Sequence, residues 1–519
     1  MNAPRGALIA LSSVLVSTAA LDAQQAPVPD SVIEAMWVEG TEGSRAEELA
    51  QVLLDSLGPR LTGSPASDRA SEWVVRTYRS WSIDARRERY GTWHGWRRGT
   101  THVDLIQPRV RSLEATMLAW SPGTIGPVEG PAVIFPGVSG EDGLATFLGT
   151  VAGKMVLLSA PEPTCRPDDN WEEYATPASF EHMKESRAAA RNAWTERIRA
   201  TGLTSRELAR KLEDAGAAAI LTSRWSRGWG VQKIFSSWTL KVPTLDLSCE
   251  DYGLVFRLAR HRQGPVVRVD AQAEDLGEVP VFNTIAEMRG TELPDEYVVL
   301  SAHFDSWDGG SGATDNGTGT ITMMEAMRIL HATYPRPRRT ILVGHWNGEE
   351  QGLNGSRAFA HDHPEVVEGL QALFNQDNGT GRVTRISMQG LTEVAPHFAD
   401  WFARIPTELT QRIRLDIPGR PGGGGSDYAS FICAGAPAFS LSSLSWDYGP
   451  YTWHTNRDTF DKIVPGDLRN NAILTAMLAY LASEDSTRLP RDRRVLPDNP
   501  RTGKQMVWPT CRDGARRSR

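Results

Sequence analysis

Apolar residues near the start of the chain recur with the period of an α-helix. Segment 44–57 carries such a series at intervals of three or four positions, formed by Ala46, Leu49, Val52, Leu53 and Leu57. This spacing puts the apolar side chains on one face, so we predict an amphipathic helix that packs on a core. Glycine and proline residues in 58–65 end that helix, and a second one is predicted over 66–81.

Farther along, short apolar runs alternate with helical patterns. The sequence predicts strands over 297–302, 340–346 and 372–376, and helices over 318–331, 355–360 and 467–482. Strands that alternate with helices build a mostly parallel sheet with helices on both faces. We therefore predict an α/β fold for this region.

The pattern changes between 110 and 272. Short β-rich runs such as 131–135 and 154–159 are separated there by glycine and proline. A helix with a capping box at Thr204 and Glu207 ends at Gly216. We interpret 110–272 as a β-rich domain inserted between two halves of the α/β domain. The two halves would be 30–109 and 273–486, followed by a loosely packed extension over 487–519.

The first 23 residues have the pattern of a secretory signal. Arg5 precedes an apolar segment over 7–20, and small residues follow before the polar Gln24. This order is typical of a cleaved signal peptide, so we expect cleavage after Ala23 and a secreted or periplasmic protein. The alternative is a helix of the mature fold. No cysteine follows the apolar segment, and no other apolar run reaches the roughly 20 residues of a membrane-spanning helix, so no stable membrane anchor is expected.

Composition narrows the class of protein. The 519 residues exceed what one core holds, and the net charge of -7 gives no reason to expect a nucleic-acid partner. The four cysteines, Cys165, Cys249, Cys433 and Cys511, allow three pairings. We favour Cys165 with Cys249, because both fall in the predicted insert; buried free thiols are the alternative. Oligomeric state does not follow from the sequence.

Metal-ligand side chains follow two of the predicted strands. His303 comes directly after strand 297–302, and Glu349 with Glu350 comes shortly after strand 340–346. The carboxyl ends of strands in an open α/β sheet lie along one edge, where ligands bind. An imidazole with several carboxylates is a ligand set for zinc or a similar ion. The pattern therefore predicts a metal-dependent hydrolase.

Several motifs in this order resemble those of metallopeptidase family 28. That family of two-zinc exopeptidases includes bacterial aminopeptidases, carboxypeptidase Q and glutamate carboxypeptidase. The matching strings are His303-Phe-Asp305-Ser-Trp-Asp308, Asp315-Asn-Gly317, Glu349-Glu-Gln-Gly352, Ser426-Asp427 and His454-Thr-Asn-Arg-Asp458. The resemblance covers most of 40–480 and implies the zinc exopeptidase fold. It also implies a cis peptide bond between Asp315 and Asn316, and the insert resembles a protease-associated domain.

The resemblance implies two divalent ions bridged by Asp315. His303 and Asp377 would hold one ion, and Glu350 and His454 the other. Nitrogen and oxygen ligands without thiolate suit zinc, with cobalt and manganese as alternatives. One carboxylate can span two ions about 3.5–4 Å apart. For Asp377 considered by itself, the alternative is an acid in a turn.

Other residues are assigned supporting roles. Glu349 is the predicted general base, because its neighbour Glu350 ligates and leaves it free to take a proton from water. Asp305 lies two residues from His303 and is expected to fix the second ring nitrogen; a helix cap or loop acid is the alternative. Asp458 would support His454 or cap the next helix, with neither preferred.

Two tyrosines are candidates to stabilise the developing oxyanion. Tyr428 and Tyr451 each flank a motif, although packing explains either one equally well. Many relatives have histidine at the position of Tyr428, which weakens its case. His345 lies within an apolar strand and is predicted to be a buried, hydrogen-bonded core residue.

Together these features predict a secreted two-zinc exopeptidase that acts on small peptides. An aminopeptidase is the first hypothesis, and a carboxypeptidase or dipeptidase of the carboxypeptidase Q type is the alternative. The two differ in whether acids hold a free amine or a basic residue holds a free carboxylate. A receptor-like homologue without activity would have lost ligands, and here every ligand position and the base are filled.

Overall fold

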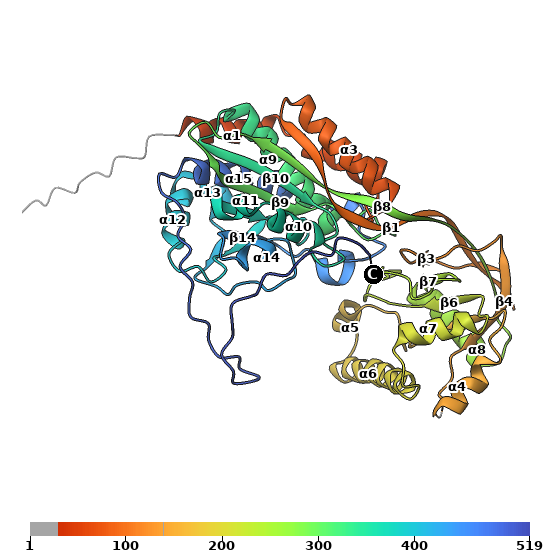
Figure 1. Cartoon of the computed structure of the whole chain (residues 1–519). Coiled ribbons are helices and arrows are strands. Elements are labelled where there is room, and N and C mark those ends of the chain that lie inside the picture. The colour runs from red at the N-terminus through yellow and green to blue at the C-terminus, as the bar shows by residue number, and fades with distance from the viewer. Residues whose placement is uncertain (1–29, 139, 519) are drawn as a thin grey trace, which may run out of the picture.

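The computed structural model describes residues 30–138 and 140–518. The predicted signal peptide, 1–23, lies outside the described residues. The described chain forms two lobes (Figure 1). The larger lobe contains both ends of the described chain, and the smaller lobe contains most of residues 110–272.

A mixed sheet forms the centre of the larger lobe, in the order β13-β12-β14-β11-β9-β10-β8, with β1 paired to β8. Its strands are β1 (Asp84–Gln107), β8 (Val266–Met288), β9 (Leu293–His303), β10 (Arg339–Trp346), β11 (Leu370–Asn375), β12 (Val383–Ser387), β13 (Arg414–Asp416) and β14 (Ala438–Ser443). The neighbours β14, β11, β9 and β10 run parallel, whereas β8 and β12 join antiparallel. The predicted α/β fold is confirmed, with antiparallel flanks that the sequence did not indicate.

Helices cover both faces of this sheet. They are α1 (Ser31–Glu42), α2 (Ala46–Gln51) with a π-helical continuation (Val52–Leu57), α3 (Pro65–Ser80), α9 (Thr318–Thr333), α10 (Asn354–Asp362), α11 (Pro364–Gly369), α12 (Ala395–Arg404), α13 (Thr407–Thr410), α14 (Ala429–Ile432) and α15 (Pro465–Glu484). None of the helices in the described ranges is long and apolar enough to cross a membrane.

Two adjacent residues of β10 show how the faces are used, because successive side chains of a strand point to opposite sides. His345 Nε2 lies 2.9 Å from the Tyr78 hydroxyl on α3. Trp346 packs against Phe359 of α10, with ring centroids 5.0 Å apart. His345 is fully buried, and burial lowers its pKa to about 3. The prediction of a buried, hydrogen-bonded core histidine is confirmed.

The smaller lobe has its own sheet, in the order β4-β5-β6-β7-β3. Its strands are β3 (Ala115–Met117), β4 (Val128–Ile134), β5 (Met155–Leu157), β6 (Ala219–Thr222) and β7 (Thr244–Leu247), and its helices are α4 (Gly140–Leu148), α5 (Asp168–Tyr174), α6 (Pro177–Arg199), α7 (Ser205–Asp214) and α8 (Cys249–Arg260). Strands β4 to β7 are parallel neighbours. The lobe is therefore more helical than the predicted β-rich domain, since α5 and α6 lie in a stretch for which no element was predicted.

Two long strands connect the lobes. Strands β1 and β8 pair antiparallel along most of their length and run from the large sheet into the smaller lobe (Figure 1). The short strand β2 (Arg111–Ser112) adds to β1, and β4 adds to β8. A disulfide joins Cys165 to Cys249 within the smaller lobe, so that predicted pairing is confirmed.

The C-terminal extension is attached to the larger lobe. A second disulfide joins Cys433 to Cys511. Farther along, the Ala515 N–H donates to Asn354 Oδ1 at 2.8 Å, and Arg516 forms a two-pronged ion pair with Asp362 at 2.7 Å. The extension is thus fastened at these points, which its proline and arginine content could not indicate, while most of 498–513 is exposed.

Candidate metal centre

Three parallel strands end beside one another and bring polar side chains to one edge of the large sheet. His303 is the last residue of β9, Glu350 follows β10, and Asp377 follows β11. They meet because β9 lies between β10 and β11. Asp315 joins them from the turn before α9, and His454 from the loop that precedes α15. All the predicted ligands therefore lie together.

Asp315 lies between the two histidines and presents one carboxylate oxygen to each. Its Oδ1 is 3.2 Å from Nε2 of His303, and its Oδ2 is 3.2 Å from Nε2 of His454. His303 Nε2 is also 3.1 Å from Asp377 Oδ1, and His454 Nε2 is 2.8 Å from Glu350 Oε2. The side chains thus form two ligand groups that share Asp315. The peptide bond between Asp315 and Asn316 is cis, as the family resemblance implied.

The polar atoms of these groups are only partly satisfied by protein. Asp315 Oδ2 and Glu350 Oε1 are buried and have no hydrogen-bond partner among the described residues. Burial, together with the charges of Asp315 and Glu349, raises the pKa of Glu350 well above its ordinary value. A divalent cation in each group would neutralise these carboxylates, and imidazole with carboxylate is a ligand set for zinc, cobalt or manganese. The residues present fit a metal in each group.

Asp305 supports the centre in a different way from the one predicted. Its backbone carbonyl, not its carboxylate, is within hydrogen-bond distance of His303 Nδ1, at 3.0 Å against 3.8 Å. The carboxylate instead accepts the backbone N–H groups of Glu349 at 3.1 Å and Glu350 at 3.3 Å. One residue therefore orients a ligand of the first group and the turn that carries Glu349 and Glu350.

Asp458 performs a similar task for the shared carboxylate. Its Oδ1 accepts the Thr314 N–H at 2.8 Å, and its Oδ2 accepts the Asp315 N–H at 3.0 Å. Burial raises the pKa of Asp458 to about 7. Neither role considered from the sequence, support of His454 or a helix cap, describes these bonds. The chain brings Asp458 to this turn from far along the sequence, which no local pattern could indicate.

Glu349 stands beside the two groups but belongs to neither. Burial raises the pKa of its carboxyl well above the ordinary value; His303 opposes this shift, and Asp377 and Asp427 reinforce it. A raised pKa favours proton uptake near neutral pH, as a general base requires. Asp427 is fully buried, neither of its oxygens has a partner in the described chain, and burial raises its pKa to about 7. Asp427 belongs to the Ser426-Asp427 motif, but no role was predicted for it.

The two candidate tyrosines, Tyr428 and Tyr451, lie in different surroundings. Tyr451 packs against Gly228 of the smaller lobe, and burial together with the charge of Asp169 raises its pKa, so it faces that lobe. Tyr428 is half-buried, and burial with the charge of Asp377 raises its pKa.

Tyr448, which the sequence analysis overlooked, lies closer to the shared carboxylate. Burial raises the pKa of Tyr448 well above its ordinary value, and the charges of Asp315 and Asp377 add to this. Its hydroxyl also contributes, with His303 and His454, to an Asp315 pKa that is low despite burial. Its place in the aromatic loop before His454 could have indicated this position. Tyr451 was predicted instead because it is closer to His454 in the sequence.

Aromatic rings from both lobes surround His454. Trp453 stacks on its imidazole with centroids 4.0 Å apart, and Trp307 lies 6.0 Å away. Phe235, from the smaller lobe, meets the same imidazole edge-on at 5.1 Å. Trp307 also donates its indole N–H to Glu350 Oε2 at 2.9 Å. The second ligand group is thus enclosed by aromatic side chains.

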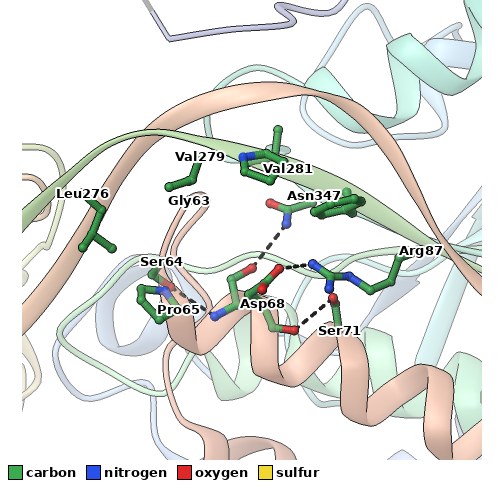
Figure 2. A pocket seen from close by; sticks show the side chains of 13 residues that line it. Gly63, Ser64, Pro65, Asp68, Ser71, Arg87, Leu276, Val279, Val281 and Asn347 are labelled. Carbon is green, nitrogen blue, oxygen red and sulfur yellow. Dashed lines mark hydrogen bonds and ion pairs between the residues drawn. The ribbon is translucent and has the colours of Figure 1, made fainter.

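A separate cavity of about 230 Å³ lies between the start of α3 and strand β8 (Figure 2). Asn347 lines it and donates through Nδ2 to Ser67 Oγ at 3.2 Å. The Thr62 hydroxyl lies 2.9 Å from Asn347 Oδ1 and 3.2 Å from Asp305 Oδ2, which connects the cavity wall to the centre. The predicted ligands and base do not line it. The cavity is therefore distinct from the metal centre.

With this geometry established, comparison with known proteins gives a family. Residues 283–479, which contain all the candidate ligands and Glu349, match peptidase family M28. This region of the chain is a peptidase family M28 domain. The protein is accordingly a hydrolase that acts on peptide bonds.

Several known proteins are similar to this chain over most of its length. Human carboxypeptidase Q is 25% identical over 455 residues, covering 88% of each protein. The structure of a peptidase M28 precursor from Shewanella amazonensis has 24% identity and a TM-score of 0.63, covering 90% of this chain and 99% of its own. BSAP, a zinc aminopeptidase from Bacillus subtilis, has 19% identity and a TM-score of 0.52, covering 83% and 93%. The two structures establish the fold.

Proposed function

We propose that the protein is a two-zinc exopeptidase that removes residues from the end of short peptides. The observation that carries this proposal is the pair of ligand groups sharing Asp315, with Glu349 beside them. His303 and Asp377 would hold one ion, Glu350 and His454 the other, and Asp315 both. Zinc, when bound, supplies Lewis acidity and lowers the pKa of water toward about 7.

Side chains of the protein carry out the proton transfer and the stabilisation of charge. Glu349 takes a proton from the attacking water and passes it to the nitrogen of the departing amine. Asp305 holds the backbone of Glu349 and so fixes where its carboxylate can lie. The Tyr448 phenol is protonated at neutral pH, and burial raises its pKa further, so its hydroxyl can donate to the oxygen that gains negative charge.

The first candidate is an aminopeptidase, which recognises the amino end of its peptide substrate. BSAP, described as a zinc aminopeptidase, shares the fold.

A dipeptidase or carboxypeptidase of the carboxypeptidase Q type is the second candidate. Its support is the length of the match to human carboxypeptidase Q and a basic side chain near the centre. That side chain is Lys233, which the smaller lobe places over the Trp453 ring at 4.5 Å. A substrate carboxylate is attracted to such a group.

We also propose export after cleavage of residues 1–23. Two disulfides support an oxidising compartment, because such bonds persist outside the cytosol. Residues 110–272 are proposed to be an insert between the two halves of the catalytic domain, with a protease-associated domain as its class.

A substrate panel tests the activity. Aminoacyl p-nitroanilides, free dipeptides and N-blocked dipeptides would be incubated with the enzyme, with and without a chelator. An aminopeptidase cleaves the anilides and spares blocked peptides, whereas the second candidate requires a free carboxylate and spares the anilides. Zinc should restore chelator-treated enzyme. Turnover that survives complete metal removal, or internal cleavage of casein as fast as dipeptide cleavage, would contradict the proposal.

A further inference from the structure

The loop that carries His454 is paired with the smaller lobe. The Ile234 N–H donates to the His454 carbonyl at 2.8 Å, and Lys233 forms an antiparallel bridge with Thr455. The Asn456 N–H donates to the Gln232 carbonyl at 3.1 Å. Residues 232–234 therefore act as a short strand against 454–456, in the same segment as a proposed zinc ligand.

One side chain, that of Asn456, fixes the register of this pairing. Asn456 Oδ1 accepts the Gln232 N–H at 2.9 Å, and Asn456 Nδ2 donates to the Gly230 carbonyl at 3.1 Å. A shift of one residue would break both bonds. Asn456 thus recognises the backbone of the smaller lobe at one position.

Gln232 links the same pairing to the sheet of the smaller lobe. Its side chain is fully buried, and its Nε2 donates to the Asp246 carbonyl on β7 at 3.0 Å. Its Oε1 accepts from the Thr116 hydroxyl on β3 at 2.9 Å and lies 3.2 Å from Asn456 Nδ2. A buried amide that loses its hydrogen-bond partners destabilises the protein. The contact between Gln232 and Asn456 is therefore difficult to break.

A nearby surface ion pair is the weaker contact. Arg457 pairs with Glu114 across the same boundary, but the two side chains are 42% and 43% exposed. Exposed ion pairs contribute about 0–1 kcal/mol to stability. The buried contact between Gln232 and Asn456 is therefore the main attachment of the His454 loop to the smaller lobe.

His454 itself needs external support. Its backbone φ is +53°, a left-handed conformation that non-glycine residues seldom adopt. Such a conformation persists where surrounding contacts determine it. Here those contacts come from Ile234 through the backbone and from Phe235 against the imidazole.

The first ligand group is built without the smaller lobe. His303 and Asp377 follow strands β9 and β11 of the large sheet. The shared Asp315 is held by Asp458, whose own carbonyl accepts the Ser311 N–H at 2.8 Å within the larger lobe. Loosening 454–456 would therefore affect His454 before it affects the first group.

We infer that Gln232 and Asn456 are positioning residues through which the smaller lobe sets the zinc affinity of the Glu350–His454 group alone. The inference rests on the proposed two-zinc function and adds a regulatory consequence. Any movement of the smaller lobe would change occupancy of one ion and leave the His303–Asp377 ion in place. The lobe is then part of the second metal site, beyond any role in shaping access to it.

Metal titration of Asn456→Ala tests this. Stepwise competition with a zinc chelator should show one ion bound about 10- to 100-fold more weakly, the range for residues that orient ligands, and the other unchanged. Asn470→Ala is the matched control, because Asn470 lies on α15 of the larger lobe, outside the 454–456 segment. Circular dichroism would confirm that each variant is folded.

Two further variants make the test specific. In a His454→Ala background the remaining ion belongs to the first group, so adding Asn456→Ala should not weaken it. Gln232→Met keeps the backbone bridge and removes the buried amide; it should weaken the same ion, and the double variant should be no worse than Asn456→Ala. Gln232→Met also serves if Asn456→Ala does not fold.

The outcomes separate the inference from its basis. Equal weakening of both ions, or of neither, overturns the inference while the two-zinc function stands. Weakening of the remaining ion in the His454→Ala background overturns it as well. If the unaltered protein binds fewer than two ions, the proposed function fails first and the inference with it.

Discussion

The carboxylate of Asp458 accepts a hydrogen bond from the backbone N–H of Asp315 at 3.0 Å. Asp315 is the residue shared by both ligand groups, so a side chain far along the sequence holds the turn on which both depend. The same carboxylate receives the Thr314 N–H at 2.8 Å. Asp458 is thus tied to the centre although it is not itself in either ligand group.

Asp458→Ala should lower both stability and zinc content. It leaves two buried N–H groups without a partner, at about 1–3 kcal/mol each. Thermal unfolding and metal analysis measure the two effects, and Asp458→Asn, which keeps one acceptor oxygen, should lie between wild type and alanine. A wild-type melting temperature with full zinc content in Asp458→Ala would contradict the role.

Asp315→Ala should lose both ions. Its two oxygens face different histidines, each at 3.2 Å, so no other side chain can replace it in both groups. Zinc per chain is measured after dialysis against metal-free buffer, with the exposed Asp295→Ala as control. Retention of two ions would show that the groups are independent, and loss of only one would show that Asp315 serves a single ion.

Glu349→Gln should keep both ions and lose at least about 10²-fold in kcat, the low end for a general base. Glutamine can still form hydrogen bonds but cannot accept the proton. Glu365→Gln, an exposed change, is the control. Near-normal turnover with full zinc content would require the base to be reassigned.

Tyr448→Phe should reduce kcat more than Tyr451→Phe. Loss of one donor to a developing oxyanion costs about 10²–10³-fold in kcat. Tyr451 faces Gly228 in the smaller lobe, so removing its hydroxyl should change turnover little. Steady-state kinetics of the pair decides between them, and a larger effect at Tyr451 would restore the assignment made from sequence.

His363→Gln should destabilise the protein most in mildly acidic solution. The hydrogen bond to Glu88 at 2.7 Å raises the pKa of His363, and it lowers the pKa of Glu88 against the effect of burial. The histidine contribution is present below its unfolded pKa near 6.5 and fades as pH rises through the raised value. The glutamate contribution is present above its unfolded pKa near 4.3 and fades as pH falls through the lowered value.

The window for this pair is therefore about pH 4.3 to 6.5. Both side chains are about a quarter exposed, at 26% and 24%, so solvent screening limits the effect. Urea unfolding should show a difference of up to about 1 kcal/mol at pH 5.5 and a smaller one at pH 8.5. A larger difference at pH 8.5 would reverse the assigned sign.

Much of the metal centre could be predicted from the residues that follow the predicted strands. His303, Glu350 and Asp377 follow apolar runs, and runs that alternate with helices become neighbouring parallel strands. Their side chains then share one edge whatever the details of packing. Asp315 and His454 do not follow from periodicity; they depended on the order of motifs that resembles the family.

Contacts between distant segments were not predictable from sequence. Asp458 was assigned by its neighbours in the chain, yet it binds the Asp315 turn. Tyr451 was preferred to Tyr448 by proximity to His454, yet the loop turns Tyr451 toward Gly228. Which face of a loop a side chain occupies depends on what packs against the loop, and local sequence carries little of that information.

Side-chain periodicity and chemistry were enough to predict the alternation of strands and helices, the residues able to bind metal and the edge where they gather. Three features became visible only in the folded chain: the Asp305 carboxylate holds a backbone turn, a disulfide from Cys433 to Cys511 fastens the C-terminal extension, and Gln232 is hydrogen-bonded to the loop of His454. Each of these is a contact between segments far apart in the chain, and such contacts form only when the whole fold brings their partners within bonding distance.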